Sequence, residues 1–213
     1  MPAPRVIAFH KPKGVVVTRS DERGRRTVYD VLPGWVREDG WVPVGRLDRA
    51  TRGLILLVRD GRLVELLTRP GGCTRTYEAW VRGRATDEHL AAILRGVTPR
   101  GKAAGPMRAV RVERLGAAGP KTRLIVELDE GRNREIRRMF GALSDPDRGT
   151  PLKVADLKRT AFGPIRLDVP SGAWRPLTDA ETRALIRAAE GGASVGRAPE
   201  RRPGPAGPSR SRT

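Results

Sequence analysis

Residues Val44–Gly61 read VGRLDRATRGLILLVRDG, and this segment indicates the fold more strongly than any other. It contains a continuous apolar run, Leu54–Val58, which suits a buried strand. A loop flanked by glycines precedes this strand and carries one carboxylate, Asp48, with arginines on both sides. Nearby guanidinium groups favour the ionised form of such a carboxylate. On spacing alone, a lone aspartate in a loop is more often a turn former or a helix cap than a catalytic group.

Short strand and helix patterns alternate on both sides of this segment. Apolar and alternating runs predict further strands, at Val6–Phe9, Val15–Thr18, Thr76–Arg82, Ala109–Leu115, Thr122–Leu128 and Val154–Thr160. Their spacing leaves room for hairpins as well as crossover connections. We therefore expect an α+β fold with a mixed, largely antiparallel sheet flanked by helices.

Two helices are predicted from their caps and apolar spacing. Thr86–Leu94 begins at an N-cap threonine and ends before Gly96, a plausible terminator. Thr178–Glu181 has the pattern of a capping box and predicts a helix to about Ala189.

A third helix is predicted near Asn133–Leu143, where apolar residues form one stripe. Arg134 and Arg138 lie on the opposite face, and Arg137 lies on the flank between stripe and solvent. A half-covered arginine on a flank is suited to fixed pairing with a carboxylate.

Composition limits the class of protein. The 213 residues include 42 Lys and Arg against 24 Asp and Glu, a formal charge of +18. No stretch approaches the ~20 apolar residues of a membrane span. The single cysteine, Cys73, excludes an intramolecular disulfide framework and a thiolate zinc site, and indicates a reducing, cytoplasmic setting. The charge favours a nucleic acid partner, although a coding bias toward arginine would produce part of it.

The chain divides into a body and a tail. We expect one catalytic domain over residues 1–190. Residues 191–213 are rich in Gly, Pro, Ser and Arg and have almost no large apolar residues. Such a segment cannot bury enough surface to offset its ordering entropy, so we expect a disordered basic tail.

Three blocks of the sequence resemble, in the correct order, the RsuA/RluE-type ribosomal RNA pseudouridine synthases. The 44–61 segment resembles that family's G-R-L-D-x-x-T-x-G-L-L-L-L-T-x-D-G signature. RTYEAWV at 75–81 resembles K-x-Y-x-V, and EGRNREIRRMF at 130–140 resembles E-G-R-N-R-Q-V-R-R-M. Shorter pieces at Lys11–Gly14, Leu157–Arg159 and Phe162–Pro164 agree as well. The resemblance covers about residues 5–178.

The resemblance implies an isomerase that converts uridine in RNA to pseudouridine without a cofactor or a metal. It implies that Asp48 is the essential carboxylate, acting as nucleophile or as base at the sugar. Arg137 matches the arginine that pairs with this carboxylate, and Tyr77 matches the aromatic residue that stacks on the target base. Without the other motifs, Tyr77 would be read as an ordinary strand residue of the core.

Basic residues around these motifs are predicted to contact RNA. They are Arg46, Arg49, Arg132, Arg134, Arg138, Lys158 and Arg159. The alternatives are that Arg46 and Arg49 shape the loop and that Arg134 and Arg138 form a solvated helix face. We expect ribosomal RNA as the partner, a monomer, and no membrane association.

Many family members carry a small RNA-binding module ahead of the block that begins here at Lys11. The sequence leaves no room for it, which favours an RluE-like enzyme of large-subunit ribosomal RNA. Three rival functions remain open: a non-catalytic RNA-binding or ribosome-assembly factor, an enzyme of transfer RNA, and a metal-dependent nuclease. The last would need clustered acidic ligands, and the acids here are scattered along the chain.

Overall fold

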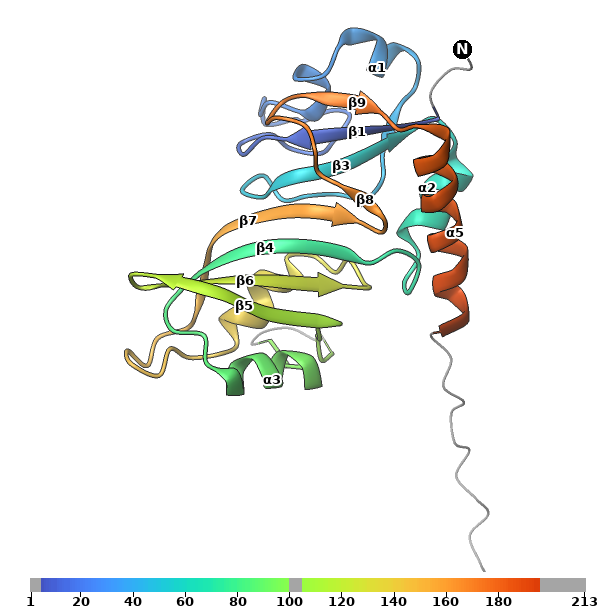
Figure 1. Ribbon diagram of the computed structural model, residues 1–213. Helices are drawn as coiled ribbons and strands as arrows, with labels where there is room; N and C mark the ends of the chain where they lie inside the picture. Colours follow the sequence, from blue (N-terminus) through green and yellow to red (C-terminus); the bar gives the residue numbers. More distant parts are fainter. Residues whose placement is uncertain (1–4, 100–104, 196–213) are drawn as a thin grey trace, which may run out of the picture.

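The computed structural model describes residues 5–99 and 105–195 (Figure 1). Within them, a nine-stranded sheet has the order β5-β6-β4-β7-β3-β1-β9, with β2 paired to β3 and β8 paired to β7. The strands are β1 (Val6–Lys11), β2 (Val42–Pro43), β3 (Arg52–Val58), β4 (Arg75–Arg82), β5 (Arg111–Ala118), β6 (Lys121–Leu128), β7 (Lys153–Phe162), β8 (Ile165–Arg166) and β9 (Trp174–Pro176).

The sheet has one parallel pair, between β3 and β7, among the strand pairs described, and the others are antiparallel. The predicted mixed, largely antiparallel sheet is therefore confirmed. At the parallel pair Gly53 lies opposite Arg159. Gly53 has φ +116°, and a Cβ at this position would lie 2.3 Å from the carbonyl oxygen of Arg159. Only glycine allows this close approach of the two backbones.

Five α-helices and one short 3₁₀ helix accompany the sheet in the described part of the chain. They are η1 (Val28–Asp30), α1 (Gly34–Glu38), α2 (Gly61–Thr68), α3 (Asp87–Arg95), α4 (Glu135–Gly141) and α5 (Asp179–Val195). None of these helices is long and apolar enough to cross a membrane.

The predicted caps are present. The Thr86 hydroxyl accepts a hydrogen bond from the backbone N–H of His89, and Gly96 is the C-cap of α3. At α5 the Glu181 backbone N–H donates to the Thr178 hydroxyl, while the Glu181 carboxylate accepts from the Thr178 backbone. Helix α5 continues past the predicted end to Val195. The remainder of the predicted tail, 196–213, lies outside the described residues.

Two strand predictions are corrected. Val15–Thr18 is not a strand; Val16 forms only an isolated bridge with Thr27. Val15 and Val17 are nevertheless buried, so their alternation reflects burial of a loop against the core. The strand predicted at Ala109–Leu115 begins two residues later and runs to Ala118 as β5. The Ala109 N–H donates instead to Ile93 at the end of α3.

The sheet separates two apolar cores. Ile55 and Leu57 of β3 belong to the first core, which also contains α4 residues such as Met139. Leu54 and Leu56 belong to the second core, together with residues of α2 and α5, which lie side by side at one end of the sheet (Figure 1). Strand β3 is thus buried on both faces, which explains its unbroken apolar sequence.

Candidate active site

The loop between β2 and β3 presents Asp48 to a cavity. It contains a turn in which the Thr51 N–H donates to the Asp48 carbonyl at 2.9 Å. Two hydrogen bonds fix the loop to the turn after β1: Gly14 N–H to the Arg49 carbonyl at 2.9 Å, and Arg49 Nε to the Gly14 carbonyl at 3.2 Å. The Asp48 side chain is 25% exposed. The carboxylate is therefore held on a fixed loop and remains accessible.

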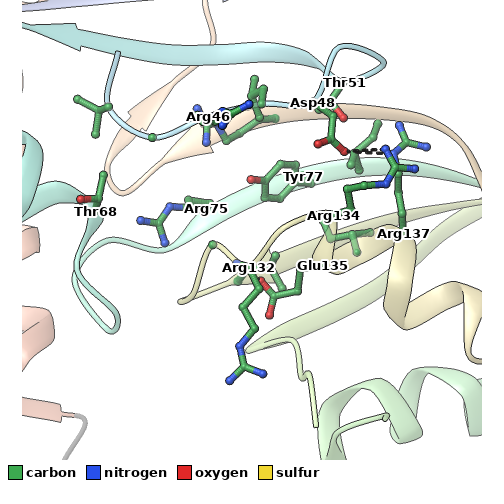
Figure 2. Close-up of a pocket in the computed structure, with 18 residues that line it drawn as sticks. Arg46, Asp48, Thr51, Thr68, Arg75, Tyr77, Arg132, Arg134, Glu135 and Arg137 are labelled. Atoms are coloured by element: carbon green, nitrogen blue, oxygen red, sulfur yellow. Dashed lines mark hydrogen bonds and ion pairs between the residues drawn. The ribbon is translucent and has the colours of Figure 1, made fainter. Parts of the chain in front are cut away.

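Two arginines at the start of α4 approach this carboxylate (Figure 2). Arg134 Nη1 donates to Asp48 Oδ2 at 3.3 Å, and Arg137 Nε lies 3.8 Å from the same oxygen. Arg134 is half exposed and has a left-handed backbone with φ 51°. This conformation is uncommon for an arginine.

Arg137 is the more buried of the two arginines, with 13% of its side chain exposed. Its Nη1 donates to the Val154 carbonyl of β7 at 2.8 Å. Burial lowers the pKa of the Arg137 guanidinium, Arg134 lowers it further, and Asp48 opposes both effects. The prediction of a half-covered flank arginine near a carboxylate is confirmed in position, whereas the shorter contact made by Arg134 was missed.

Tyr77 completes the predicted catalytic set. It lies on β4 opposite Arg159 of β7 and is buried. Asp48, Tyr77 and Arg137 all line one cavity of about 150 Å³, which we call the inner cavity. In Figure 2 Tyr77 lies between the Asp48 end and an end formed by Arg75 and Thr68. The structure thus brings together three residues that are far apart in sequence; their catalytic roles stay predictions.

Buried cations surround the same cavity. Arg75 and Arg159 both line it, and their guanidinium carbons lie 5.2 and 5.5 Å from the centre of the Phe162 ring. Arg75 donates to the carbonyls of Leu67 and Asp129 at 3.2 and 3.3 Å. Arg75 begins the block that resembles K-x-Y-x-V but was not among the predicted site residues. Residues i and i+2 of a strand share a face, and this rule would have placed Arg75 beside Tyr77.

Lys11 is a further buried cation near Asp48. It is fully buried, and its Nζ donates to the carbonyls of Pro12 and Val15 at 2.9 and 2.8 Å. Burial lowers the pKa of Lys11 to about 8; Asp48 opposes the shift and Arg159 adds to it. Lysine side chains are almost never fully buried unless they are paired. Only its place in the Lys11–Gly14 motif distinguished this residue in the sequence.

Most of the predicted RNA-contacting residues line one or both of two neighbouring cavities. Arg46, Arg132 and Arg134 line both the inner cavity and an adjoining outer cavity of about 570 Å³, and Arg49 lines the outer one. Arg159 lines the inner cavity only, because it is buried.

Two predicted contacts lie elsewhere. Lys158 is the neighbour of Arg159 on β7, so its side chain points to the opposite face of the sheet. Neither Lys158 nor Arg138 lines the inner or the outer cavity. The structure separates these two residues from the rest, and the RNA contacts of the whole set stay predictions.

A structural acid also lines the inner cavity. Glu135 is buried, and its Oε2 accepts from the Arg132 backbone N–H at 3.0 Å. Burial raises the pKa of Glu135, while the Arg132 hydrogen bond opposes that shift. Across residues 5–99 and 105–195, no three His, Cys, Asp or Glu side chains are grouped so that they could hold a metal ion.

Comparison with known proteins identifies the family. A model of the RNA pseudouridylate synthase family matches residues 5–142. The chain belongs to this family. The match includes Asp48, Tyr77 and the whole of α4, so the resemblance drawn from the sequence motifs is confirmed.

Individual relatives agree with this family. Ribosomal large subunit pseudouridine synthase B of Vibrio cholerae is 40% identical over 176 residues, which are 81% of this chain and 51% of the relative. The protein of the same name from Escherichia coli K12 is 38% identical over 184 residues, 85% of this chain and 60% of the relative. The chain thus spans only about half to three fifths of the length of these relatives. The narrower expectation of an RluE-like member stays a prediction.

Solved structures show the same fold. A crystal structure of a pseudouridylate synthase superposes with a TM-score of 0.71 and 28% identity, covering 87% of this chain and 75% of the other. A Cbf5-Nop10-Gar1 complex gives a TM-score of 0.54 at 18% identity, which indicates the fold alone. The expected catalytic-domain fold of pseudouridine synthases is confirmed.

Proposed function

We propose that this chain isomerises uridine to pseudouridine in ribosomal RNA, that its target lies in the large-subunit RNA, and that it acts in the cytoplasm. The observation that supports this activity is the inner cavity, where Asp48, Tyr77 and Arg137 meet. The proposal of a large-subunit target is supported by the names of the relatives from Vibrio cholerae and Escherichia coli.

The reaction breaks the bond between ribose C1′ and uracil N1 and forms a bond between C1′ and uracil C5. The C5 proton leaves and N1 gains a proton, so atoms and charge balance without a cofactor. Asp48 acts at the target nucleotide, either as nucleophile or as base at the sugar. Arg134 and Arg137 contact its carboxylate and keep it oriented toward the cavity. Tyr77 stacks on the base.

Access to the glycosidic bond requires that the uridine leave its stack. An extruded or already unpaired nucleotide costs less to bring into a cavity than a paired one. The outer cavity adjoins the inner one at Asp48 and is lined by Arg25, Arg46, Arg49, Arg132 and Arg134. Guanidinium groups there would bind phosphates flanking the extruded nucleotide.

The test of the proposal is Asp48→Asn. The variant keeps the size of the side chain and should form no pseudouridine, while its affinity for RNA stays close to that of the wild type. Since isomerisation does not change mass, pseudouridine is detected by carbodiimide labelling and primer extension on ribosomal RNA. A wild-type protein that binds this RNA without modifying it would instead be a non-catalytic binding factor. Undiminished activity of Asp48→Asn would reject the mechanism.

A further inference from the structure

Hydrogen-bonding atoms without partners are concentrated at the inner cavity. Four of the buried side-chain atoms that lack a hydrogen-bond partner in the described part of the chain belong to three residues that line it: Thr51 Oγ1, Arg137 Nε and Nη2, and Arg159 Nη2. Buried polar groups without partners are uncommon in folded proteins and call for an explanation. At a cavity wall, either ordered water or a bound ligand supplies such a partner.

Thr51 is the clearest case of the three. The residue is 2% exposed, and its hydroxyl has no hydrogen-bond partner. Unlike the two arginines, it carries no charge that could serve another purpose at this position. A buried hydroxyl without a partner destabilises the fold relative to a methyl group of similar size. Valine would fill the same space without this cost. The threonine is therefore unfavourable for stability as the structure stands.

The position of Thr51 indicates which part of a ligand it would meet. Its backbone N–H closes the turn that begins at Asp48, so both side chains leave the same short loop. In Figure 2 Thr51 and Asp48 lie at one end of the cavity, with Tyr77 between them and Arg75. Under the proposed function, the base stacks on Tyr77 and Asp48 acts at the target nucleotide. Thr51 is then nearer to the sugar than to the far edge of the base.

We propose that the Thr51 hydroxyl is a substrate-contacting group that hydrogen-bonds the ribose 2′-hydroxyl of the target nucleotide. This inference rests on the proposed function and extends it by one residue. A hydroxyl both donates and accepts, so the pairing satisfies Thr51 in either direction. It also gives the cavity a group that distinguishes ribose from deoxyribose.

The first test compares Thr51→Val with Thr51→Ser. Thr51→Val should leave the melting temperature unchanged or higher and should lower the single-turnover rate about tenfold, the value of one hydrogen bond. Thr51→Ser keeps the hydroxyl and should recover most of the rate. Thr51→Val with the wild-type rate, or with rate and melting temperature falling together, would overturn the proposal.

Thr122→Val provides the matched control. Thr122 is also buried, but its hydroxyl donates to the Gly83 carbonyl at 3.0 Å and accepts from the Ala85 N–H at 3.2 Å. Neither cavity includes it. This variant should lose stability and keep its single-turnover rate, the reverse of the result expected for Thr51→Val.

A second test assigns the contact to the 2′-hydroxyl. Wild type and Thr51→Val are each titrated with RNA carrying uridine or 2′-deoxyuridine at the target position. Removing the 2′-hydroxyl should weaken binding by the wild type several-fold and binding by Thr51→Val hardly at all, because the two changes remove one contact. Equal losses in both proteins would overturn the ribose assignment. A wild type that makes no pseudouridine would instead refute the proposed function.

Discussion

Arg134 donates a hydrogen bond to Asp48 at 3.3 Å, closer than the 3.8 Å separation between Asp48 and Arg137. The two arginines differ in their surroundings more than in distance. Arg134 is 51% exposed, so water and salt weaken its attraction to the carboxylate. Arg137 is buried and bound to the Val154 carbonyl. We therefore expect the buried arginine to fix the carboxylate and the exposed one to be available to an incoming phosphate.

Replacing each arginine separately tests this division. Arg137→Met should reduce the single-turnover rate by about 10² or more, because a displaced carboxylate loses its alignment. Its stability should fall as well, because the substitution removes the hydrogen bond to the Val154 carbonyl and one partner of a partly buried carboxylate. Arg134→Gln should mainly weaken RNA binding. Rates and dissociation constants separate the two effects; equal rate losses in both variants would contradict the assignment.

A substitution at the parallel strand pair tests the close approach of β3 and β7. Gly53→Ala would place a Cβ 2.3 Å from the Arg159 carbonyl oxygen in a left-handed backbone. We expect a loss of roughly 3 kcal/mol or more in the free energy of unfolding. Gly61→Ala is the control, because nothing lies within 4 Å of a Cβ there. Urea denaturation of both variants would show the contrast, and a stable Gly53→Ala would refute the packing argument.

An ion triad supports the same junction. Asp156 of β7 pairs with Arg52 at 2.6 Å and with Lys13. Asp156→Asn should lower the free energy of unfolding by about 1–3 kcal/mol at neutral pH. Asp147→Asn is the control, because Asp147 and its partner Arg84 are both more than half exposed and the pair should contribute nothing measurable.

The pH dependence of this effect follows from the pKa of Asp156. Burial raises that pKa, but hydrogen bonds from Arg52 and Lys13 outweigh burial and lower it overall. The stabilisation is therefore present above the pKa of the unfolded chain and is lost as the pH falls through the lower pKa of the folded state. Denaturation curves of wild type and Asp156→Asn should converge in that acidic range. If the difference in stability between wild type and Asp156→Asn did not change with pH, the ion triad would be excluded as the cause of that difference.

The titration of Lys11 should make the stability of the protein depend on pH in a second range, which is alkaline rather than acidic. Its pKa is lowered to about 8 in the folded state, mainly by burial. Between this value and the ordinary lysine pKa, the unfolded chain binds more protons than the folded one, so stability rises with pH. The free energy of unfolding of wild type minus that of Lys11→Met should increase from pH 8 to 10, by on the order of 3 kcal/mol at most. A flat difference would mean that Lys11 titrates normally.

Arg46 tests the proposed path of RNA. It is exposed and lines both cavities, and no hydrogen bond or ion pair holds it among the residues described. Arg46→Gln should weaken RNA binding. It should also make the slope of log association constant against log salt concentration shallower by about 0.7 to 0.9, the value for one phosphate contact. Arg166→Gln, an exposed arginine on β8 outside both cavities, should change neither quantity. Equal effects would indicate binding by net charge alone.

The sequence predicted the elements whose signals are local. The run at Leu54–Val58 and the caps at Thr86 and Thr178 specify their own strand or helix, and the structure has them. The Val15–Thr18 prediction was wrong because alternation also arises where a loop packs on a core. Periodicity likewise placed Arg137 on a covered flank of its helix.

The remainder of the site depends on contacts between distant segments. The hydrogen bond from Arg134 to Asp48 requires a left-handed residue at the start of α4, which periodicity does not indicate. The burial of Lys11 depends on strands that pair from elsewhere in the chain. Family resemblance supplied the predicted roles of Tyr77 and Asp48, which composition and spacing alone left open.

The parallel contact between β3 and β7 has a consequence for how the candidate active site forms. Asp48 enters the cavity from the β3 side of this seam, whereas Tyr77 and Arg137 come from the β4–β7 side. Neither half of the sheet contains all three predicted catalytic residues, so a nascent chain that has formed only its early strands holds Asp48 without Tyr77 and Arg137 beside it. Under the proposed function, activity begins only once the late strand β7 has joined the two halves, which ties it to completion of the fold.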